Sequence, residues 1–437
     1  MKKLVLGLCL TAAVAAIACS GKKQAPSGGN AGGTITLTGY MQIEPTDPQY
    51  AYWEPTLKAF AEKYPDIKVN FEYVTGEQFH DKFQAMASTG QIPDLFTCYA
   101  GARSDYILER GLVKDLRPYL TDEFKADYAE TIWGPQGPKG EIYIIAPNLA
   151  VCTVVYVNPK ILRQLGLTPA ETLDEMIAQV PVIRGAGFEV MMFGNSAVWP
   201  GSSLLLSALV ERTGGSEWFE RARTGDARFT DKPFVDAVTV VKQLMDEKIF
   251  PSGVNQLNGM NAITAFAQGK SPYLLSSGWI ISSIKGAAAE EDFNQFLTMP
   301  FPAISGEVSP GSSAATLGEA LAMNAKLSGD KADAAWKFLS FIYGPQGMDR
   351  MMQEANAVTY KLDVSKYNLD SLTKQYISLI SGQTMGYVFD AKMNGEGVNN
   401  ILNPGIQAVM LGDKSPQQLA EEYEAWVSAN DTNRKKR

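Results

Sequence analysis

Cysteine and histidine, which often carry catalysis or bind metals, are scarce in this chain. Its 437 residues include four cysteines and a single histidine, His80. Cys9 and Cys19 fall in the N-terminal leader, so a cysteine-rich zinc site and a cluster of histidines are both excluded by number. A Ser-His-Asp or Cys-His arrangement would have to use His80, which begins a predicted amphipathic helix and is expected at the surface. We therefore expect no catalytic residues, no bound metal and no cofactor.

The two remaining cysteines are Cys98 and Cys152. They could form a disulfide bond outside the cytoplasm. Their spacing does not show whether they are close in space, so this question stays open at the level of sequence.

The first 18 residues have the features of a secretory signal peptide. Lys2 and Lys3 give a positively charged start, residues 4–17 are almost all apolar, and small residues follow. The apolar run is too short for a membrane span. Residues 1–18 are therefore predicted to be a signal peptide.

Cys19 directly follows those small residues, an arrangement that resembles a bacterial lipobox. The pattern prefers Leu three positions earlier, where this chain has Ala16. The resemblance implies lipidation of Cys19, whereas an ordinary signal peptide with an incidental cysteine is the alternative. Residues 19–33 are rich in Gly and Ser and are predicted to be the lipidated N-terminus and a flexible tether. We expect an extracytoplasmic protein held to the bacterial membrane by its lipid anchor alone, on the periplasmic side or the cell surface.

Composition describes an ordinary globular protein with an acidic surface. Hydrophobic residues make up 45% of the chain, charged residues 20%, and the formal net charge is −8. This balance argues against nucleic acid as a partner. The basic residues 434–437 are interpreted as a frayed end. The length that remains after the leader exceeds one compact core, which predicts two lobes.

Hydrophobic periodicity predicts strands that alternate with helices, which indicates an α/β fold with a largely parallel sheet. Predicted strands cover residues 34–38, 67–73, 93–99, 273–276 and 320–325. Predicted helices cover residues 53–64, 79–88, 106–112, 204–213, 233–247 and 331–343, and the chain from 369 onward is helical with loops. Residues 142–156 are predicted to form two strands broken at Pro147-Asn148, as expected for a crossover between lobes.

Six segments in order resemble the extracellular solute-binding proteins of ABC importers, in particular the sugar-binding group that includes maltose-binding protein. They are residues 57–69, 89–97, 110–120, 140–167, 266–280 and 331–352. The chain departs from the family pattern at Tyr156-Val157-Asn158, where the family has adjacent Tyr and Asn, and at Tyr143 to Pro147. These departures affect the expected geometry of the hinge.

The resemblance implies a two-lobe periplasmic-binding-protein fold with a ligand cleft between the lobes and several hinge crossovers. Residues 34–148 and 303–356 are expected to form the first lobe, and residues 149–302 and 357–437 the second.

The resemblance also implies a sugar site, where aromatic faces stack on the ring and planar polar groups bind hydroxyls. Gln42 and Asp47 lie in the first strand-end loop, beside two of the candidates. The candidate ligand-binding residues are Trp279, Trp199, Tyr40, Glu44, Asn195, Tyr99, Asn148, Ser312, Tyr387 and Asp390. Trp279 follows Gly278 at a strand end and is the leading candidate. Arginine is scarce among these candidates, which argues against a phosphate or carboxylate ligand.

The implied function is that of a monomeric, non-enzymatic receptor that captures a sugar or oligosaccharide by lobe closure and delivers it to the membrane permease of an ABC importer. Two alternatives remain open. The same fold could bind another solute, such as a polyamine, a peptide or an anionic metabolite, and carboxylates in the cleft would suit a cation. A carbohydrate hydrolase would need two carboxylates at a defined separation, and no pair stands out.

Overall fold

The computed structural model describes residues 33–43, 46–354, 357–432 and 434–435. The predicted signal peptide, Cys19 and Glu44 therefore lie outside the described residues. Residues Thr34–Arg437 form one compact unit. Within the described part of the chain, no helix combines the length and apolar character needed to cross a membrane.

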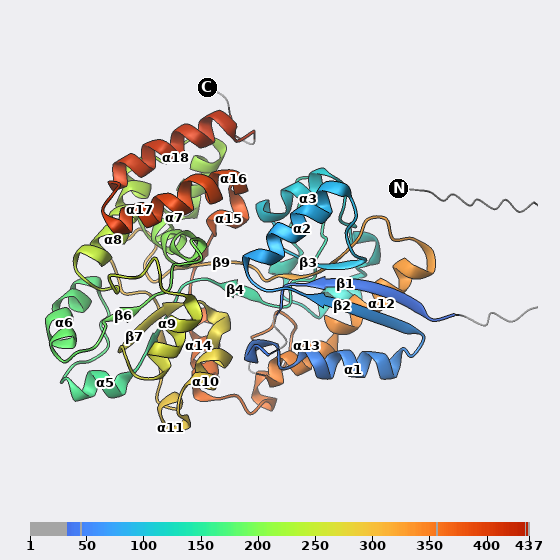
Figure 1. Cartoon of the computed structure of the whole chain (residues 1–437), viewed down its shortest axis with the longest axis horizontal. Helices are drawn as coiled ribbons and strands as arrows, with labels where there is room; N and C mark the ends of the chain where they lie inside the picture. Colours follow the sequence, from blue (N-terminus) through green and yellow to red (C-terminus); the bar gives the residue numbers. More distant parts are fainter. Residues whose placement is uncertain (1–32, 44–45, 355–356, 433, 436–437) are drawn as a thin grey trace, which may run out of the picture. The chain divides into compact units, whose positions relative to one another are not determined.

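The first lobe is built on a four-stranded sheet with the order β10-β3-β1-β2. Strand β1 (Ile35–Met41) pairs in parallel with β2 (Ile67–Tyr73) and with β3 (Leu95–Cys98), whereas β10 (Ala320–Met323) runs antiparallel to β3. Strand β10 comes from the distant part of the sequence, so the chain returns to this lobe after building the second one (Figure 1).

Helices cover this sheet because their apolar residues recur at helical spacing. Phe79, Phe83 and Ala87 are buried on one face of α2 (Glu77–Thr89), which ends at Gly90 in the left-handed conformation. The other helical segments of this lobe are η1 (Pro48–Tyr50), α1 (Trp53–Lys63), η2 (Ala102–Ser104), α3 (Asp105–Glu109), η3 (Arg117–Tyr119), α4 (Asp122–Ala126), η4 (Glu130–Trp133), α12 (Gly329–Ile342) and α13 (Pro345–Gln353).

The second lobe has its own sheet, with the order β6-β7-β5-β8. Strand β5 (Val154–Val157) runs antiparallel to both β7 (Tyr273–Ser276) and β8 (Leu297–Met299), and only β6 (Met191–Met192) pairs in parallel with β7. The prediction of a largely parallel sheet is therefore right for the first lobe and wrong for the second, because hydrophobic alternation does not specify strand direction.

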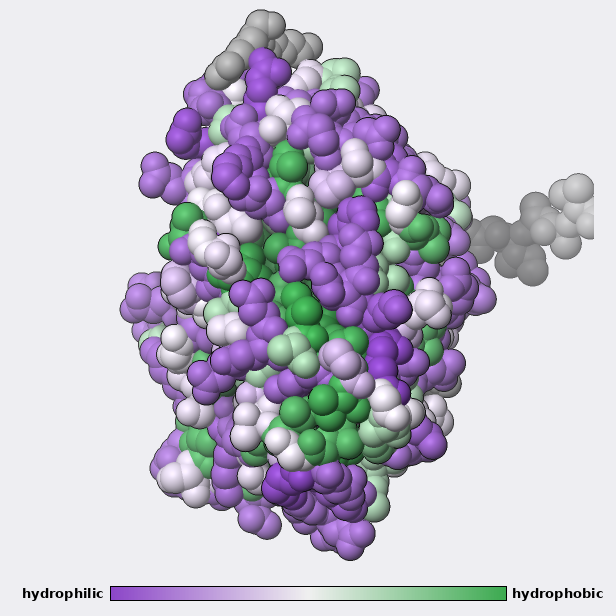
Figure 2. All heavy atoms as spheres, turned by 90° about the vertical axis from the view of Figure 1, so that its left-hand side faces the viewer, coloured by the Kyte–Doolittle hydropathy of each residue, from purple (hydrophilic) through white to green (hydrophobic). Residues whose placement is uncertain are grey.

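Many helices surround the second sheet, and two segments, η5 and η8, are π-helical. The helical segments are α5 (Pro159–Gln164), α6 (Leu173–Gly185), η5 (Gly201–Leu206), α7 (Ser207–Thr224), α8 (Lys232–Asp246), α9 (Gly259–Ala267), η6 (Gly278–Ile280), α10 (Ile281–Ala287), α11 (Glu290–Phe293), η7 (Val364–Lys366), α14 (Ser371–Gly382), α15 (Phe389–Lys392), α16 (Gly395–Gly397), η8 (Val398–Leu402), α17 (Asn403–Leu411) and α18 (Pro416–Asn430). Hydrophilic side chains cover most of the outer face of this lobe, with small apolar patches between them (Figure 2).

A third sheet joins the lobes, with the order β11-β9-β4. Strand β4 (Leu149–Val151) pairs antiparallel with β9 (Ser313–Leu317), which pairs in parallel with β11 (Met385–Gly386). Ala314 of β9 belongs to the core of the second lobe, while Leu317 packs against the core of the first. The predicted residue boundaries of the two lobes stay a prediction.

Several predicted elements agree with the structure, and two differ. The strands at residues 67–73 and 273–276 and the helix at 233–247 are confirmed. Residues 142–147 are buried but form no strand, and the following two strands are separated at Cys152-Thr153 instead of at Pro147-Asn148. The backbone groups of the first segment form hydrogen bonds with side chains and with carbonyls outside any sheet. For example, the backbone amide of Tyr143 donates to the side-chain carbonyl of Gln136.

Two of the four basic residues at 434–437, Arg434 and Lys435, form ion pairs, which corrects their interpretation as part of a frayed end. Arg434 is buried and forms an ion pair with Glu424 of α18 at 3.1 Å, and its guanidinium also donates to the carbonyl of Ala227. Lys435 pairs with Asp226. Arg434 and Lys435 thus contact the connection between α7 and α8.

Candidate functional site

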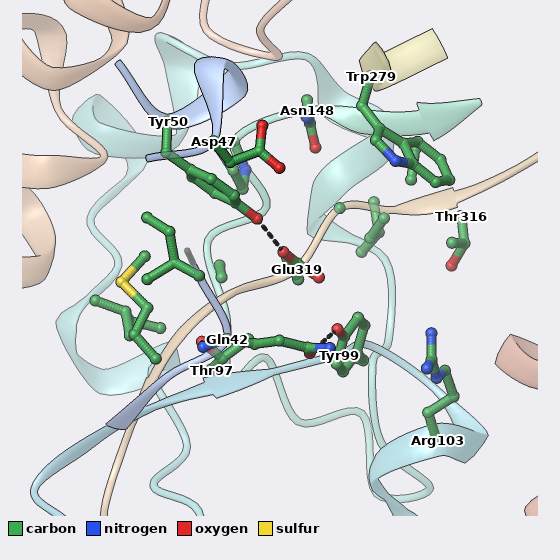
Figure 3. Close-up of a pocket in the computed structure, with 18 of the residues that line it drawn as sticks. Gln42, Asp47, Tyr50, Thr97, Tyr99, Arg103, Asn148, Trp279, Thr316 and Glu319 are labelled. Carbon is green, nitrogen blue, oxygen red and sulfur yellow. Dashed lines mark hydrogen bonds between the residues drawn. The ribbon is translucent and has the colours of Figure 1, made fainter. Parts of the chain in front are cut away.

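A cavity of about 400 Å³ lies between the two lobes. The first lobe lines it with residues that follow β1 and β3 at their carboxyl ends, where open α/β sheets usually bind ligands. The second lobe contributes Trp199, Trp279 and Asp390, and Asn148 and Glu319 come from the ends of the crossover strands, just before β4 and just after β9. The cavity is therefore made of segments far apart in the sequence (Figure 3).

Aromatic side chains enter the cavity from both lobes. Tyr50, Tyr52 and Tyr99 come from the first lobe, and Trp199 and Trp279 come from the second. Figure 3 shows Trp279 on the opposite side of the cavity from Tyr50, with Tyr99 below. Flat apolar surfaces on two sides suit a ligand that has apolar faces of its own.

A hydrogen-bond network fixes the polar floor of the cavity. Tyr99 Oη donates to the side-chain oxygen Oε1 of Gln42, and the backbone amide of Gln42 donates to Thr97 Oγ1 at 3.0 Å. Tyr50 Oη donates to Glu319 Oε1 at 3.0 Å. These bonds orient Gln42 and Glu319 before any ligand arrives, so the polar groups lose little freedom on binding.

Charge in the cavity is predominantly negative. Asp47, Glu319 and Asp390 line it together with one arginine, Arg103. Burial, aided by the nearby Arg103, lowers the pKa of His80 to about 4, so its imidazole is uncharged at neutral pH. Burial likewise raises the pKa of Tyr99 well above its ordinary value, so this phenol stays neutral.

The loop that carries Trp199 has an unusual backbone. Val198, just before it, has a φ of +70°, which is rare for a β-branched residue and marks local strain. The side chain of Asn195 holds the loop in place, since its Oδ1 accepts from the Gly201 amide at 2.8 Å and its Nδ2 donates to Asn255 at 2.9 Å. Ser203 in the adjoining π-helix also lines the cavity, and its hydroxyl has no hydrogen-bond partner among the described residues.

Residues 43–349 match the profile of the bacterial extracellular solute-binding protein family, which is more than half of the chain. The chain belongs to this family. The resemblance of the six sequence segments to solute-binding proteins is thereby confirmed, and with it a two-lobe α/β fold.

Individual relatives are distant in sequence but close in fold. A putative binding protein of Brucella abortus is 22% identical over 396 residues, covering 86% of this chain and 89% of the relative. The maltotriose-binding protein of Pyrococcus abyssi is 24% identical over 253 residues, covering 56% of this chain and 50% of the relative. A chitin oligosaccharide binding protein of known structure superposes with a TM-score of 0.79 at 19% identity, covering 92% of this chain and 99% of that one.

Five of the residues predicted from the sequence line the cavity of this solute-binding protein. They are Trp279, Trp199, Tyr99, Asn148 and Asp390. Their contact with a ligand stays a prediction.

Four other predicted residues do not line the cavity, because each is engaged elsewhere. Tyr40 is 1% exposed and its ring stacks on Phe79 at 4.9 Å, inside the first core. Asn195 is buried behind the Trp199 loop. Ser312 is buried and donates to the carbonyl of Ser309. Tyr387 packs on the second core, with Lys392 Nζ 4.6 Å from its ring. The structure therefore places these four residues outside the cavity, where their side chains pack or form hydrogen bonds within the protein.

Sequence reasoning missed several residues of the cavity. His80 lines it, which corrects its expected place at the surface, and Arg103 is the one arginine among the lining residues. Glu319 and Tyr50 were also not anticipated. Arg103 and Glu319 each come shortly after a strand and just beyond a glycine, Gly101 and Gly318, and that pattern could have marked them as strand-end loop residues.

Neither cysteine chemistry nor a metal cluster is evident in the described part of the chain. Cys98 and Cys152 are free and buried. Burial raises the pKa of Cys98 to about 12, so this thiol is not a reactive thiolate. No group of three or more His, Cys, Asp and Glu side chains that could hold a metal occurs among the described residues.

Proposed function

We propose that this solute-binding protein captures a sugar or a short oligosaccharide in its interlobe cavity and delivers it to the permease of an ABC importer. The observation that carries the proposal is the composition of the cavity. Trp199 and Trp279 supply aromatic faces from one lobe, while Gln42 and Glu319 supply oriented planar polar groups from the opposite side. The names of the maltotriose-binding and chitin oligosaccharide binding relatives agree with this chemistry.

Lobe closure provides the mechanism. Because both lobes line the cavity, only a closed arrangement contacts the ligand from both sides, so the ligand shifts the open–closed equilibrium toward the closed form. The closed form would then dock on the permease, and no reaction on the ligand is required. Glu319 is hydrogen-bonded to Tyr50 and Asp390 is paired with Arg103, arrangements that hold both carboxylates in place.

The protein is proposed to be a lipid-anchored, extracytoplasmic monomer. In this proposal residues 1–18 are removed, Cys19 is lipidated, and residues 19–33 form the tether. One acyl chain alone anchors only marginally, so we expect more than one at the mature N-terminus. Cys19→Ala should release the protein or leave an unprocessed precursor, and unchanged membrane retention with normal processing would rule the anchor out.

A thermal-shift screen tests the ligand class. A ligand that binds only the folded protein stabilises it by RT ln(1 + [L]/Kd), about 2.7 kcal/mol at a concentration of 100 Kd. We expect a rise in Tm with at least one mono- or oligosaccharide and none with spermidine or a tripeptide. A rise with spermidine alone would favour the polyamine alternative, which the excess of carboxylates in the cavity makes the second candidate.

A further inference from the structure

One ion pair joins the two lobes at the edge of the cavity. Arg103 in η2 lies with its Nη1 3.4 Å from Oδ2 of Asp390 in α15. The two side chains are 34% and 14% exposed, so solvent screens the pair only in part. The guanidinium carbon of Arg103 also lies 4.2 Å from the centre of the Tyr99 ring, which adds a cation–π contact.

The backbone next to each partner is held by hydrogen bonds within its own lobe. Beside Arg103, the amide of Gly101 donates to the Gln136 carbonyl and to Tyr143 Oη, at 3.2 and 3.1 Å. Beside Asp390, Phe389 is buried in the second core and its amide donates to Ser207 Oγ at 3.2 Å. An ion pair between two fixed segments depends on the position of one lobe against the other.

The main chains of the two lobes touch next to this pair. Gly101 has a φ of +81°, and a Cβ added there would lie 2.2 Å from the carbonyl oxygen of Ala391. Any larger residue would push η2 away from α15, so glycine permits this close approach. The lobes therefore meet at this edge through backbone as well as through charge.

A second contact between the lobes involves other elements. Pro48 in η1 of the first lobe faces Gly286 in α10 of the second, where an added Cβ would lie 3.6 Å from Pro48 Cγ. This contact is apolar and carries no charge. The lobes thus contact each other here and at the Arg103–Asp390 pair, and the residues of that pair line the cavity of about 400 Å³.

We propose that the Arg103–Asp390 ion pair is an interlobe latch that closes one end of the cavity and thereby limits the length of the saccharide. A sugar unit that extended past this end would have to separate the pair and displace Arg103 from Tyr99. The latch also favours the closed arrangement when no ligand is bound. Only the statement about saccharide length rests on the proposed function.

The latch is tested first without any ligand, by fluorescence energy transfer between dyes on the two lobes. Lys82→Cys in α2 and Gln417→Cys in α18 place exposed attachment points, while the native Cys98 and Cys152 are buried. Arg103→Gln and Asp390→Asn should each change the transfer efficiency toward that of a more open protein. Because they remove the same contact, the double variant should change it no further.

Arg223→Gln is the matched control, because Arg223 pairs with Glu220 within α7 and joins no second lobe. It should leave the transfer efficiency as in the parent protein. Single variants that also match the parent, or a double variant whose change equals the sum of the two, would overturn the latch.

The length limit is tested by calorimetric titration with maltose to maltohexaose and with cellobiose to cellohexaose. For the parent protein we expect affinity to fall beyond a short length. The Arg103→Gln and Asp390→Asn proteins should bind the short sugars roughly three- to tenfold more weakly than the parent protein does. The ratio of the affinity for short sugars to the affinity for long sugars should be smaller than in the parent protein. An unchanged preference would overturn the length limit. Failure of the parent to bind any sugar in either series would count against the proposed function, and the energy-transfer result would still decide the latch.

Discussion

Two arginine–carboxylate ion pairs in this protein differ in where they lie and in what surrounds them. Arg212 and Glu307 pair at 2.8 Å inside the second lobe and are 0% and 5% exposed. Arg103 and Asp390 pair at 3.4 Å between the lobes and are partly exposed. The first pair supports the chain just before the crossover strand β9, and the second lies in the cavity.

The surroundings explain why the first pair is structural. Arg212 also donates to the carbonyls of Ser312 and Pro302, at 3.0 Å each, and Glu307 accepts from the amides of Ile304 and Gly311. Burial lowers the pKa of Arg212, and Glu307 opposes this effect. A buried pair that also bonds to several backbone groups holds one loop in one shape, whereas a partly exposed pair between two lobes can open and close.

The largest expected effect comes from breaking the buried pair. Arg212→Gln should lower the free energy of unfolding by about 3–5 kcal/mol, because it leaves the Glu307 carboxylate buried without its partner. Chemical denaturation followed by circular dichroism measures this loss. A loss under about 1 kcal/mol would show that the pair is no more structural than the one in the cleft.

Trp279→Ala tests whether Trp279 acts mainly in ligand binding or mainly in the core. It should weaken saccharide binding by roughly 1–3 kcal/mol, because a large aromatic face is lost, whereas the Tm of the ligand-free protein should change only through the contacts that Trp279 also makes with the second core. Trp218→Ala is the control, since Trp218 packs on the second core and does not line the cavity. It should lower Tm and spare affinity; the reverse pattern would make Trp279 the core residue.

The protonation of His80, which lines the cavity beside Arg103, should make the stability of the protein depend on pH. Its pKa is lowered from 6.5 to about 4 in the folded protein, so the unfolded chain binds more protons between these values. Stability should therefore fall by roughly 2–3 kcal/mol as the pH falls from about 6.5 to about 4. His80→Asn should remove this part of the slope, and a slope that is unchanged would contradict the assignment.

Because the chain has one histidine, NMR of protein purified without a histidine tag follows this titration directly. Arg103→Gln should raise the pKa of His80, since the nearby guanidinium is one cause of its lowering. Arg223→Gln should not. Equal pKa values in the parent and Arg103→Gln proteins would mean that burial alone lowers the pKa.

The smallest expected effect is that of the interlobe pair on global stability. Arg103→Gln should change the free energy of unfolding by less than about 1 kcal/mol, because partly exposed pairs are screened by solvent and salt. Urea denaturation measures it beside Arg212→Gln. A loss as large as that of Arg212→Gln would mean that the cleft pair holds the fold together, contrary to the latch.

The sequence by itself determined the fold class, the family and much of the secondary structure. The alternation in residues 67–73 and the helical spacing of Phe79 and Phe83 are local patterns, and local sterics and burial on one face suffice to specify them. Five of the ten predicted ligand-binding residues line the cavity because strand-end loops of α/β sheets converge there.

Only the tertiary structure decided which aromatic side chains enter the cavity and how the second sheet is paired. Tyr40 and Tyr99 both lie at strand ends, yet Tyr40 stacks on Phe79 in the core while Tyr99 lines the cavity. Arg103 and Asp390 are 287 positions apart, and their contact depends on how two lobes meet. The hydrophobic pattern of a segment shows only which of its faces is buried. Strand partners, strand direction and the contact between the lobes depend on segments that are distant in the sequence.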